Sequence, residues 1–112
     1  MHQFVCSGWW EQEGLGRQSM DNLRLTFANG QIQGCGTDIV GDFELNGWVK
    51  GEEVFLRKQY LGQHQLDYLG NYDGEGVYFG VWTFGRVAGG RWLIRIESGM
   101  QIGTGPTEIG EL

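Results

Sequence analysis

The sequence predicts an all-β protein, an antiparallel eight-stranded up-and-down meander that closes into a small barrel. Apolar side chains recur at every second position of several short segments, as they do in strands, whose successive side chains point to opposite faces. Glycine accounts for 21 of the 112 residues, with one proline and no Gly-X-Y period, which favours turns and strand bends over collagen or disorder. No segment shows the sustained 3.6-residue period of a helix.

The clearest alternation lies between residues 52 and 72. Every second side chain from Val54 to Tyr72 falls on one face of an extended chain, and Gly62 interrupts the row where a tight reversal is needed. We therefore expect two antiparallel strands joined near residues 61–63. Their shared face is mostly apolar with a few polar groups, which is typical of the wall of a ligand-binding barrel.

The other strands follow in order and are separated by turn signals. We expect them over residues 4–13, 22–28, 31–36, 42–49, 77–84 and 91–97. Asn29-Gly30 and Asp73-Gly74 favour two-residue type I′ turns. Gly47 continues the apolar phase of its segment, so we interpret it as a bend within a curved strand.

Two further reversals are predicted from glycine content alone. Residues 14–19 should form a flexible loop, and Ala88-Gly89-Gly90 should reverse the chain before the last strand. Eight strands joined in this way form a single domain over residues 1–97, and closure would remove the exposed edges of the sheet. The glycine-rich segment 98–112 is expected to be a flexible tail, or an arm that orders on a partner.

Composition narrows the classes of partner. Eight Lys and Arg against fourteen Asp and Glu give a net charge of −6, which argues against nucleic acid and against an anionic membrane surface. No run of about 18 apolar residues could span a membrane, and no signal peptide is evident, so a cytoplasmic location is predicted. Cys6 and Cys35 are expected to be free thiols, and two Cys and two His without a Cys-x-x-Cys form no zinc pattern. No cofactor is predicted.

The aromatic residues occur in a distinctive order. Gly8-Trp9-Trp10 opens the chain, a lysine-bearing strand follows, and Val81-Trp82 comes near the end; between them lie Lys58, Tyr60, His64, Tyr68, Gly70 and Tyr72. Over roughly residues 7–96 this order resembles the avidin and streptavidin family. The resemblance implies an eight-stranded barrel and self-association.

The residues with which that family binds biotin are not matched. Glu11 stands where the family has an asparagine that donates to the ureido oxygen, and Leu15 stands where it has a serine. His64 and Leu66 stand in place of its serine and threonine, and the last strand has no matching aspartate. A site lacking these groups would leave a urea unpaired, so biotin is not the expected ligand.

Five residues are candidates for a binding site. They are Lys58, Tyr60, His64, Tyr68 and Trp10. If Lys58 points inward it needs a partner, and Asp38 or Glu44 is expected to supply one; otherwise it reaches solvent at the barrel rim. His64 is either a polar contact at the mouth or a solvated turn residue. Asp38 either serves a pocket mouth or binds the amides of its own turn.

The last two strands carry apolar residues on both faces, whereas a barrel strand that faces water should alternate. We assign Tyr78, Trp82, Phe84 and Leu93 to an outer face that packs on another copy of the chain or on the tail; the alternative is an apolar patch without a partner.

Three functions remain open. The first is a non-catalytic, self-associating module that binds a small apolar or aromatic ligand between walls that include Trp10, Tyr60, Tyr68 and Trp82. The second is an interaction or structural module with a solid core and no ligand. An enzyme that steers a reactive intermediate with Lys58, Tyr60 or His64 ranks last, because no nucleophile and base stand at a recognisable spacing.

Overall fold

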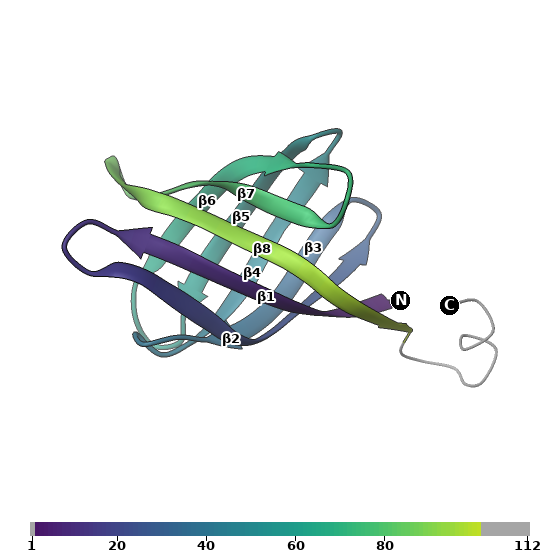
Figure 1. The fold of residues 1–112 in the computed structure, drawn as a ribbon, viewed down its shortest axis with the longest axis horizontal. Coiled ribbons are helices and arrows are strands. Elements are labelled where there is room, and N and C mark those ends of the chain that lie inside the picture. Colours follow the sequence, from purple (N-terminus) through teal and green to yellow (C-terminus); the bar gives the residue numbers. More distant parts are fainter. Residues whose placement is uncertain (1, 102–112) are drawn as a thin grey trace.

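The computed structural model describes residues 2–101 and forms a closed antiparallel barrel (Figure 1). Eight strands follow one another around it: β1 (His2–Gln12), β2 (Gly16–Ala28), β3 (Gln31–Thr37), β4 (Asp42–Lys50), β5 (Glu53–Tyr60), β6 (Gln65–Tyr72), β7 (Val77–Phe84) and β8 (Val87–Gln101). The predicted all-β, eight-stranded up-and-down meander is confirmed. Within the part described there is no helix long and apolar enough to cross a membrane.

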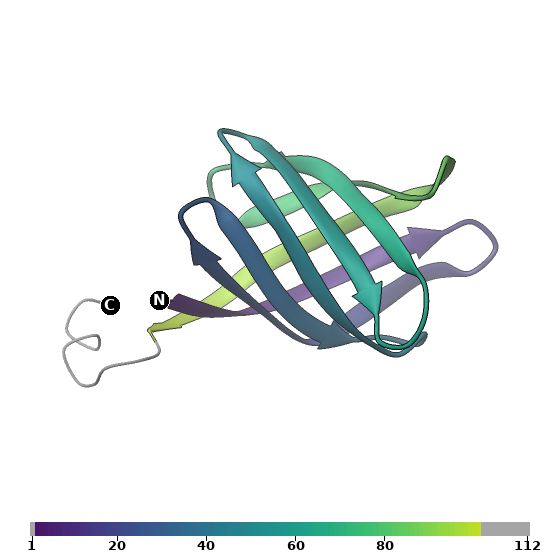
Figure 2. The same cartoon turned by 180° about the vertical axis from the view of Figure 1, so that it is seen from behind.

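Pairing of the first strand with the last closes the barrel. β1 pairs with β2 along one side and with β8 along the other, from His2 opposite Gln101 to Trp10 opposite Trp92. Figure 1 looks onto this closing pair, and Figure 2 looks from behind onto the wall that contains β3 to β6. Because β1 begins at one end, the turns after β1, β3, β5 and β7 all gather at the other end, which we call the mouth.

The interior contains the alternating row predicted from the sequence. In the hairpin of β5 and β6 the buried side chains include Val54, Leu56, Lys58 and Tyr60 on β5 and Tyr68 on β6. Other strands add large apolar side chains to the same core: Leu23, Leu25, Ile32, Phe43, Leu45, Trp92 and Ile94. Burial of this row on a closed sheet is the main stabilising contribution expected for a chain of this size.

Of the two type I′ turns predicted, that at Asn29-Gly30 is confirmed. The one predicted at Asp73-Gly74 is wrong, because residues 73–76 form a longer connection in which Gly74 and Gly76, but not Asp73, have positive φ angles. Asn29 and Gly30 have φ angles of 53° and 78°, which is the left-handed pair that a type I′ turn requires. Gly47 lies inside β4, as the prediction of a bend within one strand required. A β-carbon there would overlap the carbonyl of Phe55 on the neighbouring strand, so only glycine allows this close approach.

The reversal predicted at residues 88–90 is wrong. The chain turns earlier, at residues 85–86, and β8 has already begun at Val87. Gly89 and Gly90 lie within the strand, next to a register shift opposite Trp82 and Thr83. A β-carbon on Gly89 would overlap the Trp82 ring, so this glycine makes room for an aromatic side chain rather than for a turn.

Two boundaries also differ from the prediction. The reversal expected over 14–19 is shorter, because β2 begins at Gly16. The barrel does not end at residue 97, because β8 continues to Gln101 and pairs with the start of β1. The remainder of the predicted tail, residues 102–112, lies outside the described residues.

The outer face assigned to β7 and β8 is wrong for three of its four residues, because Tyr78 and Trp82 are buried and Phe84 lines a cavity at the mouth of the barrel. Tyr78 and Trp82 are 5% and 8% exposed and point into the barrel. Their neighbours Phe79 and Val81, which are 43% and 52% exposed, form the outer face instead. Leu93, paired with Phe79, does lie on the outer wall.

Candidate functional site

A cavity of about 450 Å³ opens at the mouth of the barrel. Residues from around its whole circumference line it: Trp10, Gln12, Glu13, Val40, Tyr60, His64, Leu66, Trp82, Phe84, Val87, Ala88 and Gly89. A cavity of this size with mostly apolar walls is within the range of small-molecule sites. We call it the mouth pocket.

Two groups of aromatic rings shape the mouth pocket. Trp10 and Trp82 meet edge to face, with ring centroids 6.2 Å apart and planes at 88°, and so form a right-angled corner. In the second group the ring centroids of Tyr60 and His64 lie 5.1 Å apart, and those of His64 and Phe84 lie 5.4 Å apart. Together they surround the opening with aromatic surface.

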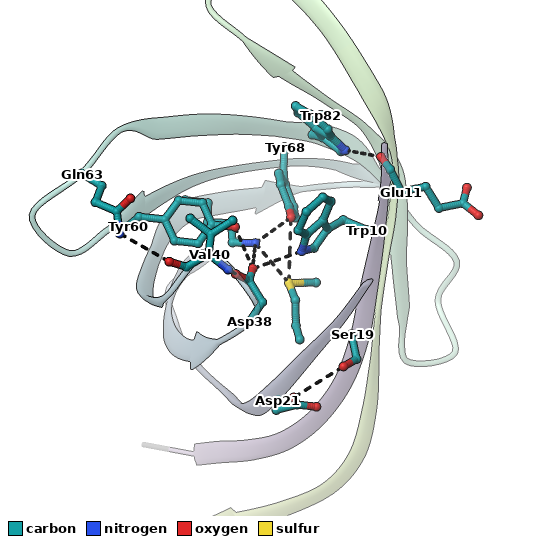
Figure 3. Close-up of polar contacts among 12 residues, drawn as sticks. Trp10, Glu11, Ser19, Asp21, Asp38, Val40, Tyr60, Gln63, Tyr68 and Trp82 are labelled. Atoms are coloured by element: carbon teal, nitrogen blue, oxygen red, sulfur yellow. Dashed lines mark hydrogen bonds and ion pairs between the residues drawn. The ribbon is translucent and has the colours of Figure 1, made fainter. Parts of the chain in front are cut away.

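The polar hydrogens of these walls are already engaged within the protein. The Trp10 indole Nε1 donates to Asp38 at 3.1 Å, and the Tyr60 hydroxyl donates to the same carboxylate at 2.7 Å. The Trp82 Nε1 donates to the backbone carbonyl of Glu11 at 2.8 Å, as Figure 3 shows. A ligand would therefore meet ring faces and edges in the walls, and polar side chains only at the rim, from Gln12, Glu13 and His64.

Below the mouth pocket lies a buried polar centre, built around Asp38 (Figure 3). One carboxylate oxygen of Asp38 accepts from Trp10, from Tyr60 and from the Lys58 ammonium, which lies 2.7 Å away. The other oxygen accepts from the backbone N–H of Val40 at 2.9 Å. The Asp38 and Lys58 side chains have no exposed area, so this ion pair is shielded from solvent.

The Lys58 ammonium has a partner for each of its three protons. Besides Asp38 it donates to the Tyr68 hydroxyl at 3.1 Å and contacts the Met20 sulfur at 3.7 Å. It also lies near four aromatic rings, the closest of which is Phe43 with its centroid 4.3 Å away. Cation–π attraction of this kind is strongest where water is excluded.

Burial and pairing shift the pKa values of this centre. Desolvation lowers the pKa of Lys58 to about 8, although the hydrogen bond and charge of Asp38 oppose that shift. Burial by itself raises the pKa of Asp38, but the hydrogen bonds from Lys58 and Tyr60 outweigh it and hold this pKa below its ordinary value. Burial, and in Tyr60 also the hydrogen bond to Asp38, raises the pKa of the Tyr60 and Tyr68 hydroxyls.

The short connection between β3 and β4 directs Asp38 inward. Its backbone bonds reciprocally with Gly41, with both N···O distances at 3.1 Å. Gly41 has a φ of 150°, a conformation that L-residues rarely adopt. Asp38 therefore binds an amide of its own turn with one oxygen and Lys58 with the other. It does not serve a pocket mouth directly, because it is not among the residues that line the mouth pocket.

The five predicted ligand-binding residues divide into two layers. Trp10, Tyr60 and His64 line the mouth pocket. Lys58 and Tyr68 lie beneath it in the polar centre and are not among its lining residues. Lys58 points inward rather than to the rim, and its partner is Asp38 and not the exposed Glu44.

The sequence interpretation missed part of the pocket wall. Phe84, assigned to an outer interface, lines the mouth pocket with 53% of its surface exposed. Trp82, assigned both to a wall and to that interface, belongs to the wall. The sequence analysis also did not identify three other lining residues, Val40, Leu66 and Glu13. Their positions at or beside the turns that gather at the mouth are a signal that could have found them.

A second hollow, of about 430 Å³, lies at the opposite end. It is more open, and the rings that line it stack on one another, with Tyr72 and Tyr78 4.4 Å apart. Its aromatic surface is thus partly used within the protein. Among residues 2–99, whose side chains are described, no three His, Cys, Asp or Glu gather where they could hold a metal ion.

No protein family matches this chain, and comparisons with curated proteins and with solved structures also give no match. Its function must therefore be argued from the geometry of the barrel.

Proposed function

We propose that this protein is a non-catalytic binding module that takes a small, flat, apolar or aromatic ligand in the mouth pocket. The observation that supports this most is the aromatic lining of a cavity of about 450 Å³ whose wall donors are already satisfied internally. Such a wall favours apolar ligand surface, because a polar ligand group placed against it would go unpaired.

The polar centre supports binding rather than catalysis. Lys58 has partners for all three of its protons, and its side chain is fully buried. A nucleophile or base has to reach its substrate, and Lys58 lies below the pocket behind Asp38 and Tyr60. We propose that the centre fixes the shape of the pocket wall by holding Trp10 and Tyr60 in place.

A thermal-shift titration with indole and with 2-naphthol tests this proposal. A ligand at ten times its Kd stabilises the folded state by about 1.4 kcal/mol, which should raise the Tm by about 5–10 °C for a domain of this size. No shift with either compound at millimolar concentration would contradict the proposal.

A pair of tryptophan substitutions locates the site. Ala88→Trp fills the mouth pocket, which Ala88 lines, and should abolish the shift. Val81→Trp places the same side chain on the exposed outer wall and should leave the shift intact. The opposite result would place the ligand outside the barrel.

A second candidate function, self-association, is favoured by the outer wall. Trp48, Phe55, Leu69 and Val81 lie directly opposite one another across β4, β5, β6 and β7. Trp48 and Leu69 are 41% and 43% exposed. We propose that this apolar row, and not the face first assigned, is where two copies of the chain pack together.

Sedimentation equilibrium tests the self-association. Leu69→Glu places a charge in the middle of the apolar row and should convert a dimer to a monomer. Gln33→Glu makes a comparable change at an exposed position of β3 and should leave the dimer unchanged. If the unmodified protein is a monomer at high micromolar concentration, the self-association proposal fails.

Two finer assignments accompany this proposal. The eight-stranded antiparallel barrel is compatible with the predicted avidin-like resemblance, which we retain for architecture only. Cys6 and Cys35 are both free thiols, which supports the cytoplasmic location expected from the sequence.

A further inference from the structure

We infer that the mouth pocket selects a cationic ligand, an aromatic ring system that carries a primary ammonium on a short chain. This inference rests on the proposed function and adds the charge of the ligand to it.

The residues that line the mouth pocket include one acid and no lysine or arginine. The acid is Glu13, which is exposed at the rim, in the turn after β1. The chain as a whole carries a net charge of −6, so the surrounding field also favours a cation.

The buried lysine does not offset this preference. Its ammonium lies 2.7 Å from Asp38, and both side chains are fully buried, so the pair is electrically neutral as seen from the pocket. Arg86 is at the same end, in the turn between β7 and β8, but it is exposed and is not a lining residue.

The walls reinforce the preference for a cation. Ring faces carry partial negative charge, which attracts ammonium groups placed over them. The wall donors that would bind an anion are occupied, since Trp10 and Tyr60 donate to Asp38 and Trp82 donates to the Glu11 carbonyl. The other side-chain donors of the lining belong to Gln12 and His64 at the rim. A carboxylate in the pocket would thus lose its hydration without a replacement in the walls.

Three probes with the same ring test the inference by isothermal titration calorimetry at pH 7.5. Tryptamine carries an ammonium, 3-ethylindole is neutral and indole-3-propionate carries a carboxylate. We expect tryptamine to bind about tenfold more tightly than 3-ethylindole, as one cation–π contact and one exposed ion pair together predict. Indole-3-propionate should bind more weakly than both.

Two variants that each remove one negative charge test whether Glu13 causes the preference for tryptamine. Glu13→Gln should reduce the advantage of tryptamine over 3-ethylindole about threefold while leaving 3-ethylindole binding unchanged. Glu75→Gln removes the same charge from an exposed turn at the opposite end and should change neither. Screening over about 8 Å at physiological salt makes that distant acid a suitable control.

The outcomes separate this inference from the proposal on which it rests. If none of the three probes binds, the proposed function itself fails. If all three bind with equal affinity, or the carboxylate binds best, the pocket binds aromatic ligands but the inference about charge is overturned.

Discussion

Asp38 is the residue on which the interior of this barrel depends most. Its carboxylate accepts hydrogen bonds from three side chains of β1 and β5 and from one backbone N–H of its own turn. A buried ion pair is not by itself strongly stabilising, because both charges lose their hydration. Removing one member, however, leaves the other charged and unpaired in the interior.

Asp38→Ala should therefore destabilise the protein by about 3–5 kcal/mol. The double variant Asp38→Ala with Lys58→Met removes both charges and should recover part of that loss. Urea denaturation of the wild type, both single variants and the double variant measures the coupling. Strictly additive free energies of unfolding would contradict the ion pair.

Lys58 can be examined directly, because Lys50 is the only other lysine. In protein labelled with ¹³C at the lysine ε-carbon, the Lys58 signal should titrate with a pKa of about 8, because desolvation lowers it. In folded protein treated with acetic anhydride, Lys50 should react readily and Lys58 only after unfolding. Equal acetylation of the two would contradict the burial of Lys58.

The sequence predicted this pair only in part. The period-two row places Lys58 between Leu56 and Tyr60, so it allows an inward position with Asp38 as partner as well as a position at the rim. The choice between the interior and the rim depends on how far along the barrel each strand extends and on where the connection after β3 lies. Neither is a local property of the sequence.

At the level of the strands, β7 shows why one prediction failed. Both of its faces are apolar, with Tyr78 and Trp82 on one and Phe79 and Val81 on the other. Alternation can assign a strand to a face only when the two faces differ in polarity. The packing of Trp82 against Trp10 and its bond to the Glu11 carbonyl settle the orientation through contacts made with a distant strand.

The reversal misplaced at Ala88-Gly89-Gly90 has a related cause. Local turn statistics favour such a run of small residues, whereas the structure uses Gly89 to accommodate the Trp82 ring and turns at residues 85–86 instead. A glycine needed for close packing cannot be distinguished from a turn glycine without knowing what lies opposite it.

Gly89→Ala should consequently disturb the mouth pocket. A β-carbon there would overlap the Trp82 ring, so the ring must move or the strand must shift, at a cost of about 1–3 kcal/mol. The neighbouring Ala88→Ser should change the free energy of unfolding by no more than about 0.5 kcal/mol. Thermal denaturation compares them, and equal stability of the two variants would contradict the assigned role of Gly89.

For the whole molecule, strand number and closure could be predicted because turn signals recur at regular spacing and an open meander would leave two exposed edges. The pocket could not be placed, because it depends on where inside the barrel the side-chain filling ends. In this protein, packed side chains fill the barrel as far as the polar centre. The mouth pocket, with its aromatic walls, lies above that centre.

Stability of the whole barrel should depend on pH on the acid side. The pKa of Asp38 is lowered in the folded state, so on acidification the unfolded chain binds the proton first. Stability supplied by this carboxylate is complete above its unfolded pKa, about 4, and is lost as the pH falls through the folded value.

Urea midpoints measured between pH 6 and pH 3 test this dependence. The wild type should lose stability more steeply than the double variant Asp38→Ala with Lys58→Met, which lacks the buried carboxylate. The pKa of Glu11 is also lowered, mainly by its hydrogen bond from Arg17, so some dependence of stability on pH should remain in both proteins. Parallel curves would show that Asp38 does not contribute to it.

The ligand site itself is tested most directly by the five tryptophan indole N–H signals in a ¹H–¹⁵N NMR spectrum recorded during a titration with tryptamine. The pocket tryptophans Trp10 and Trp82 should shift progressively with ligand. Trp9 and Trp48, which belong to outward-facing positions of β1 and β4, should not. Shifts confined to Trp9 or Trp48, or no shift in any of the five, would contradict a ligand site at the mouth of the barrel.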